Sequence, residues 1–302
     1  MQTLKIKAGS PGLAGMAAFL PGDPEFKFWF LSAILKRIKP TTTVLTYFGA
    51  LMAVDLRDYI MLRLFWFGRW EPDVSDLIEN FLKPGDVFVD VGANVGYYSL
   101  LASSIVGNSG GVVAIEASPP IFRTLEANIA LNQAENIRCL NVAASDAPGE
   151  LTVYSGTKGN SGMTTTVPVE GREIVGRVKA SQIDAVLTAD ELRRVKLIKI
   201  DVEGGELAIL RRLLYTIDDF PVDMGIVVEM TPVFGGDALV DIFRRLCESG
   251  FKAYRVHNDY RWRSYQTWKA PTPLVPITTL DETVSDILLT RQARPAGGFG
   301  MQ

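Results

Sequence analysis

Histidine and cysteine are scarce in this chain of 302 residues, which carries one histidine, His257, and two cysteines, Cys139 and Cys247. One imidazole excludes a metal site built from several histidines, and the two cysteines form no metal-binding spacing. So few thiols are typical of a reducing compartment, and we expect a cytoplasmic protein with two structural cysteines. His257 is a conceivable catalytic base, although a lone histidine after an edge strand is more often structural.

A strong charge of one sign and long apolar runs are also missing. The sequence has 31 lysines and arginines against 34 acidic residues, and a net charge of −3 gives no reason to expect a nucleic acid partner. Residues 12–20 are apolar, but the run is short and ends at a Pro-Gly pair, which argues against a secretory signal. Residues 24–39 mix aromatic with basic residues and are too short and too charged to span a bilayer. We expect a helix packed on the main domain there, with a membrane-surface or partner-binding helix as the alternative.

Strand-like and helix-like segments alternate from residue 87 onward. The strand-like segments are apolar and rich in β-branched residues, and they cover 87–91, 112–116, 137–144, 197–201 and 224–230. Helical patterns lie between them, at 96–106, 119–131, 206–215 and 238–249. This alternation predicts a mostly parallel sheet with helices on both faces. Two further strands, 251–256 and 286–290, have only a loop between them, so we expect one of the two to be antiparallel at the sheet edge.

We place the start of this domain near residue 70. Before it, residues 41–56 form two strand-like runs around Phe48-Gly49-Ala50, which predicts a β-hairpin. Residues 1–69 are therefore an N-terminal extension or cap made of a helix and a hairpin, and residues 70–292 are the main domain. Residues 293–302 form a glycine-rich segment that we expect to be a flexible tail.

The stretch Val87–Leu100 (VFVDVGANVGYYSL) passes from a buried strand into a helix through Gly92-Ala-Asn-Val-Gly96. Such a turn presents free backbone N–H groups to a ligand, as in nucleotide-type cofactor sites. A dinucleotide fingerprint needs a second glycine at the closest approach to the pyrophosphate, where this chain has Asn94. Asp90 would repel phosphates but could hold an ammonium group. The turn therefore favours a ligand that brings a carboxylate and an ammonium group.

Glu116 ends the next strand. It follows the turn by about the number of residues that separates the turn from the acid that binds the ribose hydroxyls in nucleotide-binding folds. A carboxylate accepts two hydroxyl hydrogen bonds in a fork. Alone, such an acid can also be a helix N-cap or a solvated loop residue. Together with the turn, it predicts S-adenosylmethionine, with the amino-acid end at Asp90 and the turn and the ribose at Glu116.

The Val87–Leu100 stretch and the later Lys199-Ile-Asp-Val-Glu-Gly-Gly-Glu206 together resemble the FkbM family of S-adenosylmethionine-dependent methyltransferases, over about residues 70–290. The resemblance implies a class I methyltransferase fold, which is a Rossmann-like, mostly parallel seven-stranded α/β sheet. It also implies methylation of a hydroxyl group on a sugar, a polyketide or a similar secondary metabolite, and it places residues 143–146 near the adenine. The candidate cofactor-binding residues are Glu71, Asp90, Gly92, Ala93, Asn94, Gly96, Glu116, Ala117, Ser118, Ala143, Ala144 and Asp201.

Methyl transfer from a sulfonium is an in-line displacement, and a neutral alcohol is a poor nucleophile, so a base or a metal ion is expected near the methyl group. Asp201 is the first candidate for the base, with a contact to the cofactor amine or a loop-organising role as the alternative. Glu203 could share this role or cap the next helix, and Lys199 lies on the same strand face as Asp201. Glu229 ends the fifth strand in a similar position. Carboxylates at these strand ends could bind Mg²⁺, but nothing in the spacing requires a metal, and we assign no metal ligand.

The acceptor pocket has two candidate walls in the sequence. One is the polar loop 159–166, and the other is a group of aromatic residues, Tyr254, Tyr260, Trp262, Tyr265 and Trp268. Packing over the sheet surface is the alternative role for both.

We therefore expect an S-adenosylmethionine-dependent O-methyltransferase that acts on a small hydroxylated molecule. An NAD-dependent oxidoreductase is the alternative enzyme class, and both Asn94 and Asp90 disfavour it. A non-catalytic, membrane-associated protein that keeps the methyltransferase fold is the third candidate.

Overall fold

A computed structural model describes residues 23–230, 232–280 and 285–292 of the chain. The predicted tail at 293–302 and the apolar run at 12–20 lie outside these residues. Among the helices described, none combines the length and the apolar character that crossing a bilayer requires.

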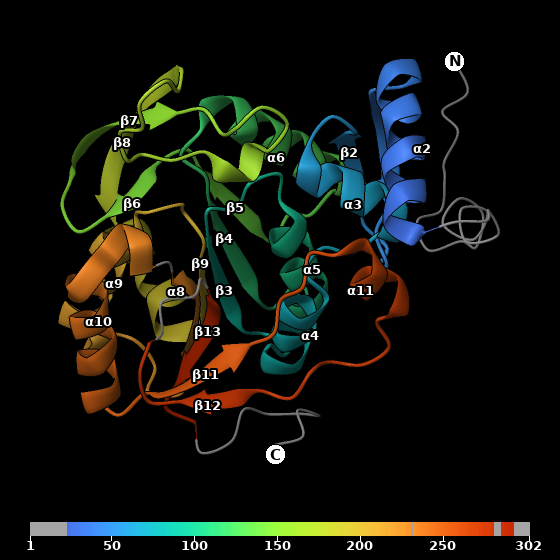
Figure 1. The fold of residues 1–302 in the computed structure, drawn as a ribbon. Helices are drawn as coiled ribbons and strands as arrows, with labels where there is room; N and C mark the ends of the chain where they lie inside the picture. The colour runs from blue at the N-terminus through green and yellow to red at the C-terminus, as the bar shows by residue number, and fades with distance from the viewer. Residues whose placement is uncertain (1–22, 231, 281–284, 293–302) are drawn as a thin grey trace.

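The centre of the molecule is an eight-stranded sheet in the order β12-β11-β13-β10-β9-β3-β4-β5 (Figure 1). Parallel pairing joins β10 to β9, β9 to β3, β3 to β4 and β4 to β5. Residues of β3 are buried along its whole length, which explains why that strand is an unbroken apolar run around Asp90. The strands of this sheet are β3 (Val87–Val91), β4 (Gly111–Ile115), β5 (Ile137–Leu140), β9 (Val195–Ile200), β10 (Gly225–Met230), β11 (Lys252–Val256), β12 (Val275–Ile277) and β13 (Ser285–Thr290).

Of the two predicted last strands, β13 is antiparallel to its neighbours, and it lies between β10 and β11 rather than at the edge. The predicted edge position is therefore wrong. The side chains Ile287, Leu288 and Leu289 are almost completely buried, which suits a central strand with both faces covered. The seven expected strands are all present, and the short β12 adds an edge strand beside β11.

Helices cover both faces of the sheet, and each face has its own hydrophobic cluster (Figure 1). Alternate residues of β3 point to opposite faces, so Phe88 joins one cluster while Val87 and Val89 join the other. The first face carries α4 (Pro72–Phe81), α5 (Tyr97–Val106) and α6 (Pro119–Asn132), and the second carries α7 (Ile183–Val186), α8 (Ala189–Arg194), α9 (Glu206–Tyr215) and α10 (Pro232–Glu248). The structure thus confirms the predicted α/β fold.

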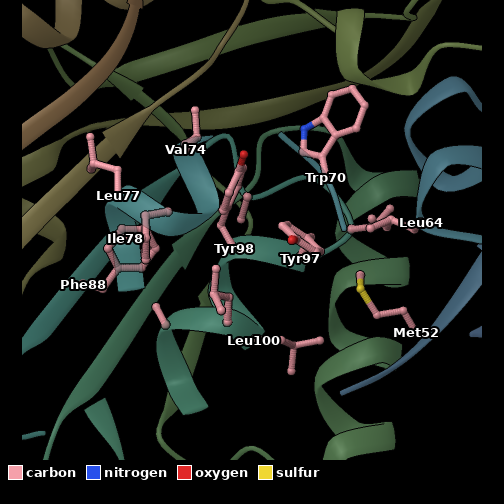
Figure 2. Close-up of a cluster of buried hydrophobic side chains, with 14 of the residues drawn as sticks. Met52, Leu64, Trp70, Val74, Leu77, Ile78, Phe88, Tyr97, Tyr98 and Leu100 are labelled. Atoms are coloured by element: carbon pink, nitrogen blue, oxygen red, sulfur yellow. The ribbon is translucent and has the colours of Figure 1, made fainter. Parts of the chain in front are cut away.

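The predicted N-terminal helix and hairpin are present. They are α2 (Pro24–Ile38) and the antiparallel pair β1 (Thr41–Leu45) and β2 (Leu51–Asp55), followed by α3 (Tyr59–Phe67). The carboxylates of Asp23 and Asp58 cap α2 and α3 by accepting backbone N–H groups of the first turn. Figure 2 shows Met52 and Leu64 of this segment in the same buried cluster as residues of α4, β3 and α5. The extension and the residues after 70 therefore share one hydrophobic core.

A separate three-stranded sheet, in the order β6-β8-β7, lies beyond the end of β5. Its strands are β6 (Ala143–Ser145), β7 (Gly149–Tyr154) and β8 (Ile174–Gln182). The predicted strand 137–144 is therefore divided between two sheets. The break comes at Asn141, whose side-chain amide donates hydrogen bonds to the carbonyl groups of Glu116 and Ala117. Short helices complete the fold: η1 (Ser161–Met163), η2 (Ile217–Asp219) and α11 (Trp262–Thr267).

Candidate active site

A cavity of about 350 Å³ lies where β3, β4, β9 and β10 end, lined by residues from the carboxyl end of each. In open α/β sheets, ligands bind outside the carboxyl ends of the strands. Residues 160–166 of the predicted loop 159–166 form a second wall, and Tyr59, Trp70 and Tyr260 form a third. The cavity is therefore assembled from the extension, the central sheet and the loop between β7 and β8.

The floor of the cavity is the glycine turn after β3. Gly92 has a φ of +83°, and a Cβ atom there would lie 1.8 Å from the carbonyl oxygen of Asp201. The backbones after β3 and β9 thus touch at this point, and the N–H of Asp201 donates to the carbonyl oxygen of Val91. Only glycine permits this contact, which brings Asp201 to the turn.

Glu116 faces the cavity from the end of β4, and backbone groups fix its carboxylate. The N–H of Asn94 donates to its Oε2 at 2.9 Å, and the N–H of Ser118 donates to its Oε1 at 2.8 Å. Burial raises the pKa of Glu116 to about 7, while these two N–H donors act in the opposite direction. The carboxylate spans the turn and retains lone pairs for a ligand that donates from the cavity.

The cavity has an apolar wall beside Glu116. Ala117, Ala143 and Ala144, all predicted site residues, contribute to it. It also includes apolar side chains from β4, α6, β7 and the β5–β6 connection, which are Ile115, Ile121, Val142 and Val153. An acid at one side of an apolar slot suits a flat, apolar ring attached to a hydroxylated group.

A partly buried ion pair supports the acidic end of β9. The Nζ of Lys199 lies 2.8 Å from Oδ2 of Asp201 and 4.8 Å from the centroid of the Tyr98 ring. Lys199 is only 3% exposed, and the charges of Asp201, Asp90 and Glu71 raise its pKa against the effect of burial. Lys199 is therefore a charged support behind the cavity wall, and Asp201 lines the cavity.

Three carboxylates gather around the ends of β9 and β10. Asp201, Glu203 and Glu229 each place one carboxylate oxygen within 4.8 Å of the other two. Burial raises the pKa of Glu203 to about 7, with the charge of Asp201 as the next cause, and it raises that of Glu229 to about 10. Oxygen ligands at such distances could hold a hard cation such as Mg²⁺, and a carboxyl group with a pKa near 7 can exchange protons at neutral pH.

Glu71, the residue just before α4, also lines the cavity. Its carboxylate accepts a hydrogen bond from Tyr98 Oη at 2.5 Å and another from Tyr260 Oη at 2.7 Å. Of the four described non-glycine residues with a positive φ, three line the cavity: Glu71 (39°), Asn94 (49°) and Glu203 (53°). Left-handed backbone costs energy for such residues, and it concentrates at functional sites.

Most predicted site residues line one cavity, and five lie behind its wall. Asp90, Ala93, Gly96, Ser118 and Lys199 are not on the cavity surface. Asp90 is fully buried, its Oδ2 accepts a hydrogen bond from Ser99 Oγ at 2.6 Å, and burial raises its pKa. Gly96 precedes α5, where a Cβ atom would lie 2.7 Å from Leu125. These positions shape the turn and the strand ends rather than the surface of the cavity.

The structure adds Tyr59, Trp70 and Asp286 to the predicted lining residues. Asp286 stands opposite Glu229 in the antiparallel pairing of β10 and β13, and a strand that begins with an acid was the signal in the sequence. Of the aromatic residues predicted for the acceptor wall, Tyr260 lines the cavity, whereas Tyr254 and Tyr265 are buried in the core. His257 is exposed and does not line the cavity.

Known proteins resemble this chain in sequence and in fold. It is 30% identical over 172 residues to the methyltransferase sdnD of Sordaria araneosa, a match that covers 46% of this chain and 62% of that protein. It is 27% identical over 143 residues to the hexuronic acid methyltransferase AglP of Haloferax volcanii, covering 47% of this chain and 56% of that protein. The chain thus spans less than two thirds of the length of these curated relatives. A solved O-methyltransferase from Thermotoga maritima has 13% identity and a TM-score of 0.42, covering 84% of this chain and 79% of that one.

A family match covers the ends of β3, β4, β9 and β10, where the cavity lies. Residues 90–253 match the Methyltransferase FkbM domain, from the end of β3 to the start of β11. That is more than half of the 302 residues. The central sheet is Rossmann-like and of the class I methyltransferase type. The chain therefore belongs to the FkbM methyltransferase family.

Proposed function

We propose that this chain is an S-adenosylmethionine-dependent O-methyltransferase that acts on a hydroxyl group of a small molecule such as a sugar, a polyketide or another secondary metabolite. The observation that carries the proposal is the position of Glu116, whose carboxylate is held across the glycine turn and faces an apolar slot. A nucleoside fits both parts, because the ribose can donate to the acid while the adenine occupies the slot. The adenine wall is formed by Ala143 and Ala144 with their apolar neighbours.

The amino-acid end of the cofactor is assigned to the turn and to the carboxylates that line the cavity. Asp90 has no exposed surface, so we propose that it supports the turn through Ser99 rather than contacting the ammonium group directly. Asp201 lines the cavity beside Gly92 and is the better placed acid for that contact. Lys199 holds Asp201 in place through their ion pair.

The bound cofactor supplies an electrophilic methyl group, and this chain's residues position the acceptor and take its proton. Glu203 is the better base, because its carboxyl makes no side-chain hydrogen bond to the residues described and its pKa lies at about 7. Asp201 is already engaged by Lys199. As the acceptor oxygen takes the methyl group that the cofactor would supply, its hydroxyl proton would pass to the Glu203 carboxylate. Asp201 therefore holds the ammonium group of the cofactor, and Glu203 accepts the proton of the acceptor hydroxyl.

The names of two relatives bear on the acceptor class. AglP is named for a hexuronic acid, which is a sugar derivative, and sdnD is named only as a methyltransferase. A small hydroxylated acceptor agrees with a cavity of about 350 Å³. A metal ion at Asp201, Glu203 and Glu229 would supply a Lewis acid, and the proposal does not require one.

A screen with methyl-labelled S-adenosylmethionine tests the proposed reaction. The chain is incubated with a panel of sugars, amino sugars and polyketide alcohols, and the products are analysed by mass spectrometry. We expect label on an acceptor oxygen, one S-adenosylhomocysteine formed per methyl transferred, and inhibition by added S-adenosylhomocysteine. Label on carbon or nitrogen alone would contradict O-methylation, and turnover of NADH without methyl transfer would favour the oxidoreductase alternative.

A further inference from the structure

Acidic side chains dominate the cavity. Six carboxylates line it, and no lysine, arginine or histidine does so among the residues described. The six are Glu71, Glu116, Asp201, Glu203, Glu229 and Asp286. The proposed cofactor carries two positive groups and one negative group, so it offsets only part of this charge. An anionic acceptor would therefore enter against the field of the site.

Four of the six carboxylates have partners within the protein. Glu116 accepts two backbone N–H groups, Glu71 accepts two tyrosine hydroxyls and Asp201 pairs with Lys199. Oδ2 of Asp286 accepts a hydrogen bond from the amide of Asn258 at 2.7 Å. In the described part of the chain, no hydrogen bond or ion pair reaches the carboxyl groups of Glu203 and Glu229, and Arg172 acts on Glu203 only through its field.

Glu229, one of the two acids without a partner among the described residues, lies next to Asp286 on the sheet. Glu229 and Asp286 are opposite residues of antiparallel strands, an arrangement that destabilises like charges. Burial raises the pKa of Glu229 to about 10, with the charges of Asp201 and then Asp286 as the next causes, and burial with the charge of Glu71 raises the pKa of Asp286 to about 7. A cation bound at this wall would relieve the repulsion between the two opposite acids.

Aromatic side chains also line the cavity. Trp70 and Tyr260 both line it, with ring centroids 5.5 Å apart and planes inclined by 30°. Aromatic faces combined with carboxylates are the surroundings in which proteins bind ammonium groups. A metal ion would use the carboxylates but gain nothing from the rings.

We propose that the acceptor carries an amine beside its reacting hydroxyl, and that Glu229, with Asp286 and the rings of Trp70 and Tyr260, binds the resulting ammonium group. This inference rests on the proposed function, since it concerns the acceptor half of the same cavity. It predicts an amino sugar or another amino alcohol as substrate class, and it excludes uronic acids. Glu203 remains free to take the hydroxyl proton beside the bound ammonium.

Binding to the complex with S-adenosylhomocysteine tests the inference without turnover. Glucosamine, N-acetylglucosamine and glucuronate have the same kind of sugar ring and are cationic, neutral and anionic. Ethanolamine and ethylene glycol form a smaller pair, one cationic and one neutral, that can enter a narrower pocket. Affinities are measured by ligand-detected NMR in EDTA, and then with Mg²⁺. We expect each amine to bind at least about tenfold more tightly than its neutral partner, with glucuronate the weakest.

Two variants distinguish the effect of Glu229 on amine binding from the effect of the protein's overall charge. Glu229→Gln keeps the size of the side chain and is expected to reduce the amine preference to less than about twofold. Glu126→Gln changes an exposed residue of α6 and is expected to leave the preference unchanged. Thermal unfolding of both variants confirms that the fold is kept.

Three results would overturn the inference. They are equal or tighter binding of the neutral or anionic probes, a preference for amines that survives Glu229→Gln, and tight Mg²⁺ binding that excludes the amines. If S-adenosylhomocysteine itself does not bind, the proposed function fails. If it binds and the amines show no preference, only the acceptor assignment fails.

Discussion

At the scale of single residues, the site depends on close contacts that the sequence indicates only in part. The glycine turn and Glu116 were recognisable because the turn, the acid and their spacing lie within one βαβ unit. Trp70 and Asp286 were not, because they reach the cavity from segments on opposite sides of the FkbM match in the sequence. The buried position of Asp90 also required the structure, since a strand-ending acid looks the same in sequence whether it faces a cavity or a helix.

Proton acceptance by Glu203 gives the first prediction at this scale. Single-turnover methylation of an acceptor found in the screen should accelerate as the pH rises from about 6 to 8, because the pKa of Glu203 is about 7 and its ionised form is the base. Glu203→Gln should lower the rate by about 100-fold or more and remove this pH dependence. Asp201→Asn serves as the comparison, since it should slow the reaction but keep the pH-dependent limb. If Asp201→Asn removes the limb and Glu203→Gln does not, Asp201 is the base.

At the scale of secondary structure elements, the hydrophobic periodicity predicted which segments are helices and which are strands, because both depend on local sequence. The alternating strands and helices after residue 87, and the helix and hairpin before residue 70, were all indicated by the order of apolar residues. The insertion of β13 between β10 and β11 was not, because strand order depends on long-range pairing. Similarly, the run 137–144 appears as one strand in sequence, and the hydrogen bonds of Asn141 accompany its division between two sheets.

Helix α2 provides a prediction at this scale, because one side of it is buried and the other is exposed. Phe28 is 1% exposed and stacks on Trp262 with ring centroids 4.8 Å apart and planes at 8°, whereas Phe26 is 62% exposed. Phe28→Ala should lower the free energy of unfolding by about 3–5 kcal/mol, and Phe26→Ala should change it by about 0.5 kcal/mol or less. Urea unfolding measures both. Equal effects would mean that α2 does not pack on the domain as described.

At the scale of the whole molecule, the cavity joins parts of the chain that are far apart in sequence. Glu71 accepts hydrogen bonds from Tyr98 and Tyr260, which links the start of α4 to α5 and to the segment after β11. The FkbM match covers residues 90–253, so Glu71, Tyr260 and Asp286 lie outside it while lining the same cavity. Residues beyond the matched domain therefore contribute to the proposed acceptor side of the site, whereas the proposed nucleoside pocket lies within the match.

The most direct test of the central claim is calorimetric titration of the chain with S-adenosylhomocysteine and, separately, with NADH. We expect S-adenosylhomocysteine to bind and NADH not to bind. Glu116→Ala should weaken S-adenosylhomocysteine by at least about tenfold, because the variant removes a carboxylate that accepts charge-assisted hydrogen bonds. Glu126→Ala, which changes an exposed residue of α6, should bind like the unaltered chain. Binding of NADH without S-adenosylhomocysteine, or unchanged affinity in Glu116→Ala, would contradict the account.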